Sequence, residues 1–415
     1  MKVLLINPNR YRTPPVPPIG LEYIGAGLGA AGHAWHLLDL CFADDPEAGI
    51  DRAISDFHPD IAGVTIRNID SVIYQNNIFF LDEIARYIKQ VKSRGIPVIL
   101  GGAGFSFAAR ELVAYLGADG GIAGPGERAF PQFLDLFGTG DMAEGTIIYG
   151  FSAGIDPDLR VRRGTAVDYP RYLRERGIAG FETQKGCTGK CPYCLEHCRE
   201  NLLFRNPRAV VSEVRDLVEQ GATSFHLCDT EFNQDLAHSK AFLRALIDER
   251  LPIKWALYMK SSPYDGELFQ LLRESGANLI TLSIPTGSEW MDDAREQIRL
   301  AREHGIKFAI DLLTGFPGQN LDDIRRIIAA LRSFEPETIG INSTFRLMKR
   351  MPVAERVMSS DEHRKYLLGA VTDNPDLVKP VFYQWLTVDM LRELTAGDPV
   401  FRIEGFERTS NYERI

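Results

Sequence analysis

Four of the six cysteines lie close together in the sequence and could bind a metal through their sulfur atoms. The first three, Cys187, Cys191 and Cys194, have the spacing CxxxCxxC, and Cys198 follows four residues later. Thiolates are soft ligands for iron–sulfur clusters and for zinc. Three thiolates on one short loop can bind three irons of a 4Fe-4S cluster, which leaves the fourth iron open for a substrate or a cofactor.

The identity of the metal depends on how these cysteines are used. Structural zinc sites usually pair two CxxC knuckles, and only Cys191 and Cys194 form one here, which favours a 4Fe-4S cluster. An electron-transfer cluster needs a fourth ligand. Cys198 is either that ligand or an additional thiol that does not bind the cluster.

The composition is that of a packed globular protein. The chain has 415 residues, 45% apolar and 25% charged, and at roughly 150 residues per domain this length predicts two to three domains. The net charge of -9 and the absence of a basic run argue against nucleic-acid binding and favour small-molecule partners. The amino terminus has only four apolar residues in succession, too few for a signal peptide or a membrane span, so we expect a cytoplasmic protein with no membrane partner.

Residues 1–137 alternate short β-branched runs with amphipathic segments, as in an α/β fold. The predicted strands are residues 3–6, 35–40, 61–66, 98–100 and 120–123. Five strand–helix units predict a doubly wound, Rossmann-like parallel sheet with helices on both faces. Ligands of such sheets bind beyond the carboxyl ends of the strands, near the point where the strand order reverses.

The loops that follow these strands supply the candidate ligand-binding residues of the first half. Two of the loops are glycine-rich, and glycine allows a phosphate-bearing ligand to approach the backbone amides; simple tight turns are the alternative explanation. No GxGxxG motif follows the first strand, which disfavours a dinucleotide. The candidates are Asn7, Thr65, Arg67, Asn68, Gly101, Gly102, Gly104, Gly124, Gly126 and Glu127.

The second half alternates strands and helices again, after an expected linker at residues 138–177. Six strand–helix units over residues 178–350 predict three quarters of an eight-stranded barrel, whose active groups lie at the carboxyl-terminal rim. The cysteine loop follows the first of these strands and therefore belongs to that rim. Residues 351–415 lack the alternation, and we expect a short C-terminal extension that covers the open side of the partial barrel.

These features together resemble a known superfamily. CxxxCxxC after the first strand of a partial barrel, with the aromatic Tyr193 just before the last cysteine, looks like the radical S-adenosylmethionine (SAM) superfamily. With a doubly wound domain upstream, the chain resembles the subgroup that has an N-terminal cobalamin-binding domain. Supporting stretches are residues 17–21, 101–104, 124–127, 229–233 and 315–318.

The resemblance implies three cofactors: a 4Fe-4S cluster, SAM and cobalamin. In the family, the open iron binds the amino and carboxylate groups of SAM, and one electron from the cluster yields a 5'-deoxyadenosyl radical that abstracts hydrogen from an unactivated carbon. Carried over to this sequence, Cys187, Cys191 and Cys194 bind the cluster, and Tyr193 lies near the adenine of SAM. Cys198 must then stay off the fourth iron, because a thiolate there would exclude SAM.

The same resemblance assigns roles to further residues at the rim. The SAM contacts are Glu231, Lys260 and Ser283 around its polar part, and Leu313 and Leu347 against its adenine. The catalytic candidates are Cys228 and Glu231. Cys228 is expected to donate hydrogen to the substrate or to contact it, and the alternative is a small buried apolar residue.

Two features depart from the pattern of relatives. The DxHxxG motif, whose histidine coordinates cobalt in one cobalamin class, is absent, so Arg67, Asn68 or another residue after the third strand would face the cobalt. Residues 285–288, after the fourth strand, lack the acidic residue that relatives often carry there.

The expected function is cobalamin-dependent methylation of an unactivated centre in a small molecule, with electrons from a donor such as flavodoxin or ferredoxin. The alternative is a radical SAM enzyme without functional cobalamin that catalyses cyclisation, rearrangement or transfer of the 3-amino-3-carboxypropyl group of SAM. A non-catalytic cobalamin or iron–sulfur sensor is disfavoured, because no output domain remains once both folds are assigned.

Overall fold

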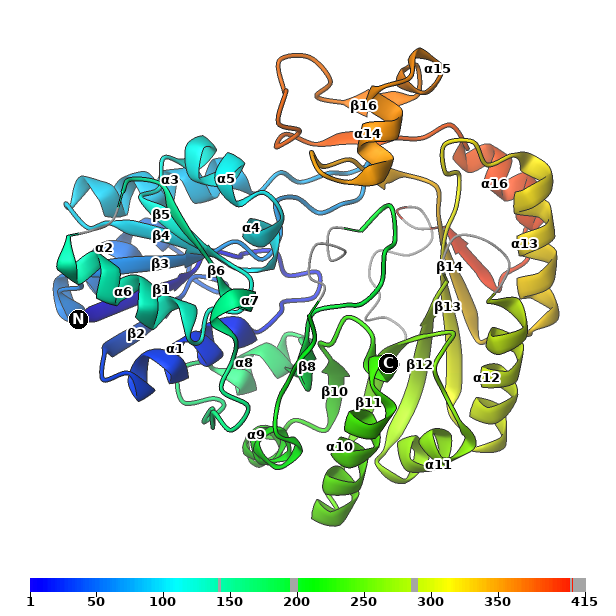
Figure 1. Ribbon diagram of the computed structural model, residues 1–415, viewed down its shortest axis with the longest axis horizontal. Coiled ribbons are helices and arrows are strands. Elements are labelled where there is room, and N and C mark those ends of the chain that lie inside the picture. The colour runs from blue at the N-terminus through cyan, green and yellow to red at the C-terminus, as the bar shows by residue number, and fades with distance from the viewer. Residues whose placement is uncertain (141–142, 195–200, 285–289, 404, 406–415) are drawn as a thin grey trace. The chain divides into compact units, whose positions relative to one another are not determined.

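The computed structural model describes most of the chain as two compact units (Figure 1). The described residues are 1–140, 143–194, 201–284, 290–403 and 405. The first unit comprises Met1–Ser71, Ile78–Phe181 and Leu203–Ala222, and the second Val72–Asn77, Glu182–Leu202 and Thr223–Ile415. No helix of the described residues combines the length and the apolar character that crossing a membrane requires.

A parallel six-stranded sheet forms the core of the first unit, in the order β2-β1-β3-β4-β5-β6. Val3, Leu4, Leu5 and Ile6 of β1 are all buried, as expected of a parallel strand with both faces covered. The strand order reverses between β1 and β3, so the carboxyl ends of these strands are the expected ligand position. The strands are β1 (Lys2–Asn7), β2 (Ala34–Asp39), β3 (Ile61–Thr65), β4 (Val98–Gly101), β5 (Gly120–Ala123) and β6 (Thr146–Tyr149).

Helices cover both faces of this sheet. One group contains α1 (Ile19–Ala30), which packs against α6 (Ala129–Thr139). The other contains α2 (Pro46–Phe57), α3 (Leu81–Ser93) and α5 (Ala109–Leu116), in which α3 contacts both neighbours. Shorter helices are α4 (Ala103–Phe107), α7 (Gly150–Ala153) and α8 (Tyr169–Arg174).

A buried ion network ties the segment after this sheet to α1. The side chain of Arg163 is fully buried, and its Nε donates to Glu22 Oε2 at 2.7 Å. The Tyr169 hydroxyl donates to the same oxygen at 2.6 Å, and Glu213 of α9 (Pro207–Glu219) lies 3.8 Å from Arg163 Nη1. Because buried charges are costly unless paired, these partners hold the segment and α9 close to α1 within the first unit.

The second large sheet has the order β18-β14-β13-β12-β11-β10-β7. Each neighbouring pair from β10 to β18 is parallel. The strands are β7 (Ala179–Phe181), β10 (Ser224–Leu227), β11 (Lys254–Lys260), β12 (Ala277–Ser283), β13 (Lys307–Leu313), β14 (Thr338–Asn342) and β18 (Phe401–Ile403). Two shorter strands, β8 (Gln184–Lys185) and β9 (Leu203–Phe204), flank the cysteine loop in sequence. The last strand, β18, comes from the expected C-terminal extension, where the sequence showed no strand pattern.

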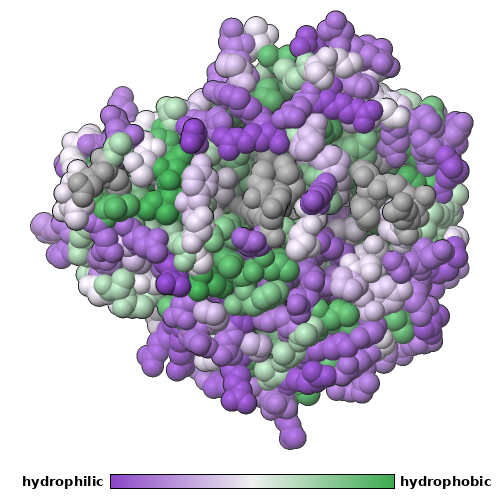
Figure 2. Space-filling view, viewed as in Figure 1, coloured by the Kyte–Doolittle hydropathy of each residue, from purple (hydrophilic) through white to green (hydrophobic). Residues whose placement is uncertain are grey.

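Amphipathic helices pack along the outer face of this sheet in Figure 1. They are α10 (Leu236–Glu249), α11 (Gly266–Glu274), α12 (Met291–Glu303) and α13 (Leu321–Ser333), with the 3-10 turn η2 (Phe232–Gln234) before α10. Alternation along β11 separates the two faces, because Leu257 and Met259 are buried whereas Tyr258 and Lys260 remain partly accessible. Figure 2 shows mainly hydrophilic residues at the edge where α12 and α13 lie.

A small antiparallel sheet, β15-β17-β16, follows the parallel strands. Its strands are β15 (Phe345–Arg346), β16 (Leu367–Gly369) and β17 (Val381–Tyr383), accompanied by α14 (Pro352–Met358), α15 (Asp361–Arg364) and α16 (Val388–Thr395). The predicted fold class, a doubly wound α/β sheet followed by a parallel strand–helix region and a short C-terminal part, is confirmed.

Candidate active site

The cysteine loop begins directly after β8. Cys187 is buried, and Cys191 and Cys194 are half-buried. A Cβ atom built on Gly189 would lie 3.2 Å from Cys187 Sγ and 3.8 Å from Cys191 Sγ, so two of the thiols converge on this glycine. The Gly189 amide donates to Cys187 Sγ at 3.3 Å, and the Cys194 amide to the Cys191 carbonyl at 3.1 Å.

This donor set fits a cluster that is bound through separate irons. None of these three cysteines forms a disulfide. No three His, Cys, Asp or Glu side chains in the described part of the chain converge where one metal ion would bind. A 4Fe-4S cluster places each thiolate on a different iron, so its ligands need not converge on one point. Cys198 lies outside the described residues, as do residues 285–288.

The loop that follows β10 forms hydrogen bonds with the residues that precede the cysteine loop. Asp229 is buried and accepts hydrogen bonds from the Thr183 amide at 2.7 Å, the Gln184 amide at 3.2 Å and the Thr183 hydroxyl. The Gln184 side chain donates to the Glu231 carbonyl at 2.6 Å. Burial raises the pKa of Asp229 to about 7, against the lowering effect of its donors. Asp229 therefore positions the strand end from which the cysteine loop departs.

Glu231 is the most unusual ionisable group at this rim. Glu231 is only 8% exposed, and its Oε2 has no hydrogen-bond partner among the described residues. Burial raises the pKa of Glu231 to about 8, and the negative charge of Asp311 adds to this effect, whereas Ser283 and Lys260 oppose it. A buried carboxyl with an unused oxygen is ready to receive a cationic or hydrogen-bond-donating ligand.

The inward positions of the strands carry polar side chains below this rim. The Tyr258 hydroxyl of β11 donates to Asp311 Oδ2 of β13 at 3.2 Å, which spans the intervening strand β12. The ring of His226 on β10 lies 5.7 Å from the Tyr258 ring, and burial lowers the pKa of His226 to about 4, so the imidazole is neutral near pH 7. Cys228, two residues further along, is exposed rather than a buried apolar residue.

Aromatic and apolar residues border the last part of the rim. The ring centroids of Tyr193 and Phe316 lie 5.4 Å apart, and those of Phe316 and Phe345 lie 4.5 Å apart. Leu313 ends β13 and is half-buried. Leu347 is completely buried, with its amide bonded to the Val381 carbonyl, so it is covered by the chain itself.

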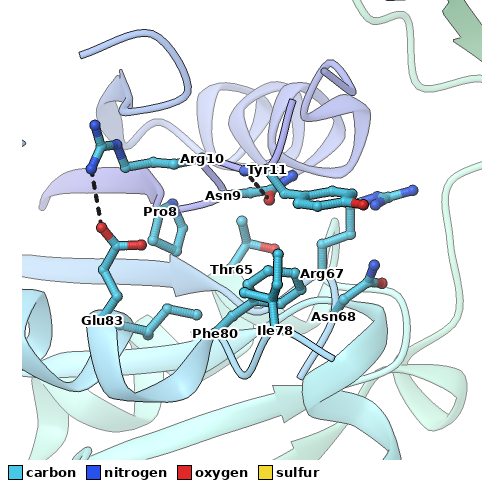
Figure 3. A pocket seen from close by; sticks show the side chains of 11 residues that line it. Pro8, Asn9, Arg10, Tyr11, Thr65, Arg67, Asn68, Ile78, Phe80 and Glu83 are labelled. Carbon is cyan, nitrogen blue, oxygen red and sulfur yellow. Dashed lines mark hydrogen bonds and ion pairs between the residues drawn. The ribbon is translucent and has the colours of Figure 1, made fainter. Parts of the chain in front are cut away.

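A pocket opens at the carboxyl ends of β1 and β3 in the first unit, where the strand order reverses (Figure 3). Of the predicted ligand residues, Thr65, Arg67 and Asn68 line it. Asn7 does not: it is buried, and its amide donates to Asp39 Oδ1 at 2.8 Å. The other lining residues are Pro8, Asn9, Arg10, Tyr11, Ile78, Phe80, Glu83 and Ile84.

Arg10 and Glu83 form the polar end of this pocket. Arg10 donates to Glu83 Oε1 at 3.1 Å and to the Ala43 carbonyl at 3.1 Å, and Tyr87 donates to the same Glu83 oxygen at 2.7 Å. Arg10 Nε is buried and has no hydrogen-bond partner in the described chain. The pocket thus combines apolar walls, aromatic rings and an unused donor, which fits a large organic cofactor.

The first of the predicted glycine loops packs closely against residues that line the pocket. Gly102 has φ +99°, and a Cβ there would lie 2.6 Å from Thr65 Oγ1. A Cβ on Gly104 would lie 2.9 Å from the Arg67 carbonyl. These glycines allow the loop after β4, which starts at Gly101, to pack against residues of the pocket wall.

The second glycine loop also packs against the chain. A Cβ on Gly124 would lie 2.9 Å from the Phe151 ring, and one on Gly126 would lie 2.2 Å from Ile24. Glu127 is buried, and its carbonyl would lie 2.1 Å from a Cβ on Gly27 of α1. Close packing therefore accounts for both glycines.

Comparison with known families identifies both parts of the chain. Residues 10–134 match the B12 binding domain, and residues 181–331 match the radical SAM superfamily. This chain belongs to the radical SAM superfamily and carries an N-terminal B12-binding domain. The predicted resemblance is confirmed.

Relatives of this radical SAM protein match both domains. It is 26% identical to tryptophan 2-C-methyltransferase of Streptomyces laurentii, over 90% of this chain and 77% of the relative. It is 23% identical to cytidylyl-2-hydroxyethylphosphonate methyltransferase of Streptomyces wedmorensis, over 75% of this chain and 70% of the relative. The fold matches that of the radical SAM methyltransferase TsrM from Kitasatospora setae with a TM-score of 0.85 and 23% sequence identity. The match covers 99% of this chain and 92% of the TsrM chain.

Sequence reasoning missed part of the B12-domain pocket of this radical SAM protein. Asn9 and Arg10 lie two and three residues after the end of β1, so the rule that located Asn7 also points to them. Phe80 and Glu83 had no such signal, because they come from the start of α3, well beyond the end of β3. Only the tertiary fold brings that helix end to the pocket.

Proposed function

We propose that this protein is a cobalamin-dependent radical SAM methyltransferase that acts on a small molecule. The observation that carries this proposal is the presence of two separate cofactor sites in one chain: a three-cysteine loop at the rim of a parallel sheet, and a pocket at the switch point of a B12-binding domain. The two named relatives act on chemically different compounds but are both methyltransferases, which supports the reaction rather than a particular substrate.

Different residues of the chain are proposed to bind the cluster and cobalamin. Cys187, Cys191 and Cys194 would hold the cluster, and Arg67 and its neighbours in the pocket would hold cobalamin. When bound, the cluster supplies the electron for SAM cleavage, and cobalamin carries the methyl group. An external donor such as flavodoxin or ferredoxin would provide the electron.

Glu231 is proposed to bind a cationic group of SAM. Its pKa of about 8 means that it is largely protonated near pH 7 in the free protein. A cation placed against it favours the carboxylate, so SAM binding is expected to release a proton. Calorimetry of SAM binding in buffers of different ionisation enthalpy measures this release. Binding enthalpies that do not depend on the buffer would contradict the role of Glu231.

Tyr258 and Asp311 are proposed to bind a polar group of the substrate. Both side chains are partly accessible, and their hydrogen bond joins β11 to β13 across β12, so one substrate group can reach both. The negative charge of Asp311 favours an amine or an N–H donor.

The decisive experiment uses full-length protein purified and reconstituted anaerobically. We expect a cobalamin absorption spectrum, about four irons per chain, and transfer of label from [methyl-13C]SAM to a substrate, with tryptophan as the first probe. S-adenosylhomocysteine in the product mixture supports methyl transfer. Methylthioadenosine would instead indicate aminocarboxypropyl transfer, and failure to bind cobalamin would refute the proposal. A Cys191→Ala variant that keeps cobalamin but loses iron separates the two sites.

A further inference from the structure

Gln234, the last residue of η2, holds the backbone on both sides of Cys187. Its Nε2 donates to the Gly186 carbonyl at 3.1 Å, and its Oε1 accepts from the Thr188 amide at 2.8 Å. The Thr188 hydroxyl donates to the same Oε1 at 3.3 Å. One side chain therefore fixes both peptides that flank this cysteine, and with them the direction of its thiol.

Lys260 completes this arrangement from the end of β11. Its Nζ donates to Thr188 Oγ1 at 3.2 Å and to Gln234 Oε1 at 3.3 Å. A Cβ on Gly189 would lie 3.7 Å from this ammonium and 3.2 Å from Cys187 Sγ. The positive charge thus sits beside the cysteine loop, bound there by two neutral oxygens.

The backbone of Lys260 is fixed as firmly as its side chain. The buried Asn233 accepts from the Lys260 amide at 2.8 Å and donates to the Lys260 carbonyl at 3.0 Å. The same carbonyl accepts from Gln297 Nε2 at 3.0 Å. A charge held this way needs little reorganisation when the charge of a neighbouring group changes.

A fixed cation acts more strongly on the reduced form of a cluster than on the oxidised form. Reduction adds one electron, so the reduced cluster with its thiolates is more negative and gains more from a nearby ammonium. Hydrogen bonds and charge around a cluster are among the factors that set its reduction potential.

We propose that Gln234 and Lys260 form a clasp that fixes Cys187 and raises the reduction potential of the bound cluster. Both are positioning residues, and Lys260 acts on the cysteine loop rather than on SAM. The inference rests on the cluster site of the proposed function. It goes beyond that function, because it names the residues that make reduction of the cluster by the external donor more favourable.

The test is a potentiometric titration of the cluster in the full-length, reconstituted protein, followed by electron paramagnetic resonance. Lys260→Gln keeps a hydrogen-bonding group but removes the charge, and we expect its midpoint potential to be lower than that of the wild type. Lys260→Arg should restore a potential close to the wild type. Lys240→Gln is the matched control, because Lys240 pairs with Asp265 and Glu267 at the surface, and its potential should not change.

Iron retention tests the second half of the clasp. Gln234→Leu removes the hydrogen bonds on both sides of Cys187, and we expect a chelator to extract iron about 10-fold faster, as the loss of one or two such bonds implies. Unchanged potential in Lys260→Gln with full iron content overturns the inference, as does equal potential in the Gln and Arg variants. Weaker SAM binding with an unchanged potential would assign Lys260 to SAM. Wild-type protein that binds no cluster would refute the proposed function itself.

Discussion

Replacing Glu231 by glutamine should make the stability of the protein much less dependent on pH. In the unfolded chain a glutamate releases its proton near 4.5, whereas burial raises the pKa of Glu231 to about 8 in the folded protein. Below pH 4.5 the carboxyl is neutral in both states. Between pH 4.5 and 8 the unfolded state releases the proton and the folded state keeps it, so folding stability falls as the pH rises through this window.

The size of the effect follows from the same two values. A difference of one in pKa corresponds to about 1.4 kcal/mol, so the shift from 4.5 to about 8 predicts a loss on the order of 5 kcal/mol at most by pH 9. Glutamine has nearly the same shape and never ionises. Glu231→Gln should therefore differ from the wild type by less than about 1 kcal/mol at pH 5 and be more stable by several kcal/mol at pH 9, within that upper bound.

Urea denaturation of the apoprotein at pH 5, 7 and 9 measures this difference. The buried Trp255 in β11 reports unfolding of the second unit. Glu274→Gln, at the exposed end of α11, is the control and should leave the pH profile unchanged. If Glu231→Gln follows the wild-type profile up to pH 9, the Glu231 carboxylate is stabilised in the folded protein, and the reasoning from burial is wrong.

Three further predictions concern other parts of the chain. Arg163→Met removes the ion pair of the buried Glu22 carboxylate and should cost about 3–5 kcal/mol in urea unfolding, whereas Arg299→Met, in an exposed ion pair, should change little; equal effects would contradict the burial argument. Tyr258→Phe should raise the substrate KM about 10-fold or more with iron and cobalamin contents unchanged, whereas Tyr264→Phe, which breaks a surface bond of the same 3.2 Å length, should not. Arg67→Ala should lower the cobalamin content measured by absorbance and spare the iron content; unchanged cobalamin binding would remove Arg67 from the site.

Local sequence patterns were sufficient for the architecture of both halves. Parallel strands that are buried on both faces, such as β1, read as continuous apolar runs, and the helices between them show a clear apolar face. The strands that sequence reasoning missed include β6 and β18, which lie in the expected linker at residues 138–177 and in the expected C-terminal extension. Neither segment shows the alternation of strand and helix patterns that marks the rest of each half.

Contacts between distant residues explain what the sequence could not predict at the sites. Leu347 was expected against adenine, but it directly follows β15, is completely buried, and bonds through its amide to the Val381 carbonyl of β17. For Cys228 the alternative of a small buried apolar residue is wrong, because the residue follows β10 and is exposed. Side-chain direction at a strand end depends on the register of neighbouring strands, which a single sequence does not state.

The sequence by itself determined the family and indicated Cys187, Cys191 and Cys194 as the proposed cluster ligands, because three cysteines with a fixed spacing on one loop are a local feature. The tertiary structure decided the chemical state of the groups around them. Glu231 has a raised pKa because other strands and loops bury it, and Lys260 reaches Thr188 because β11 ends beside the cysteine loop. Burial and charge pairing are sums over residues far apart in the chain, so only the folded protein sets them.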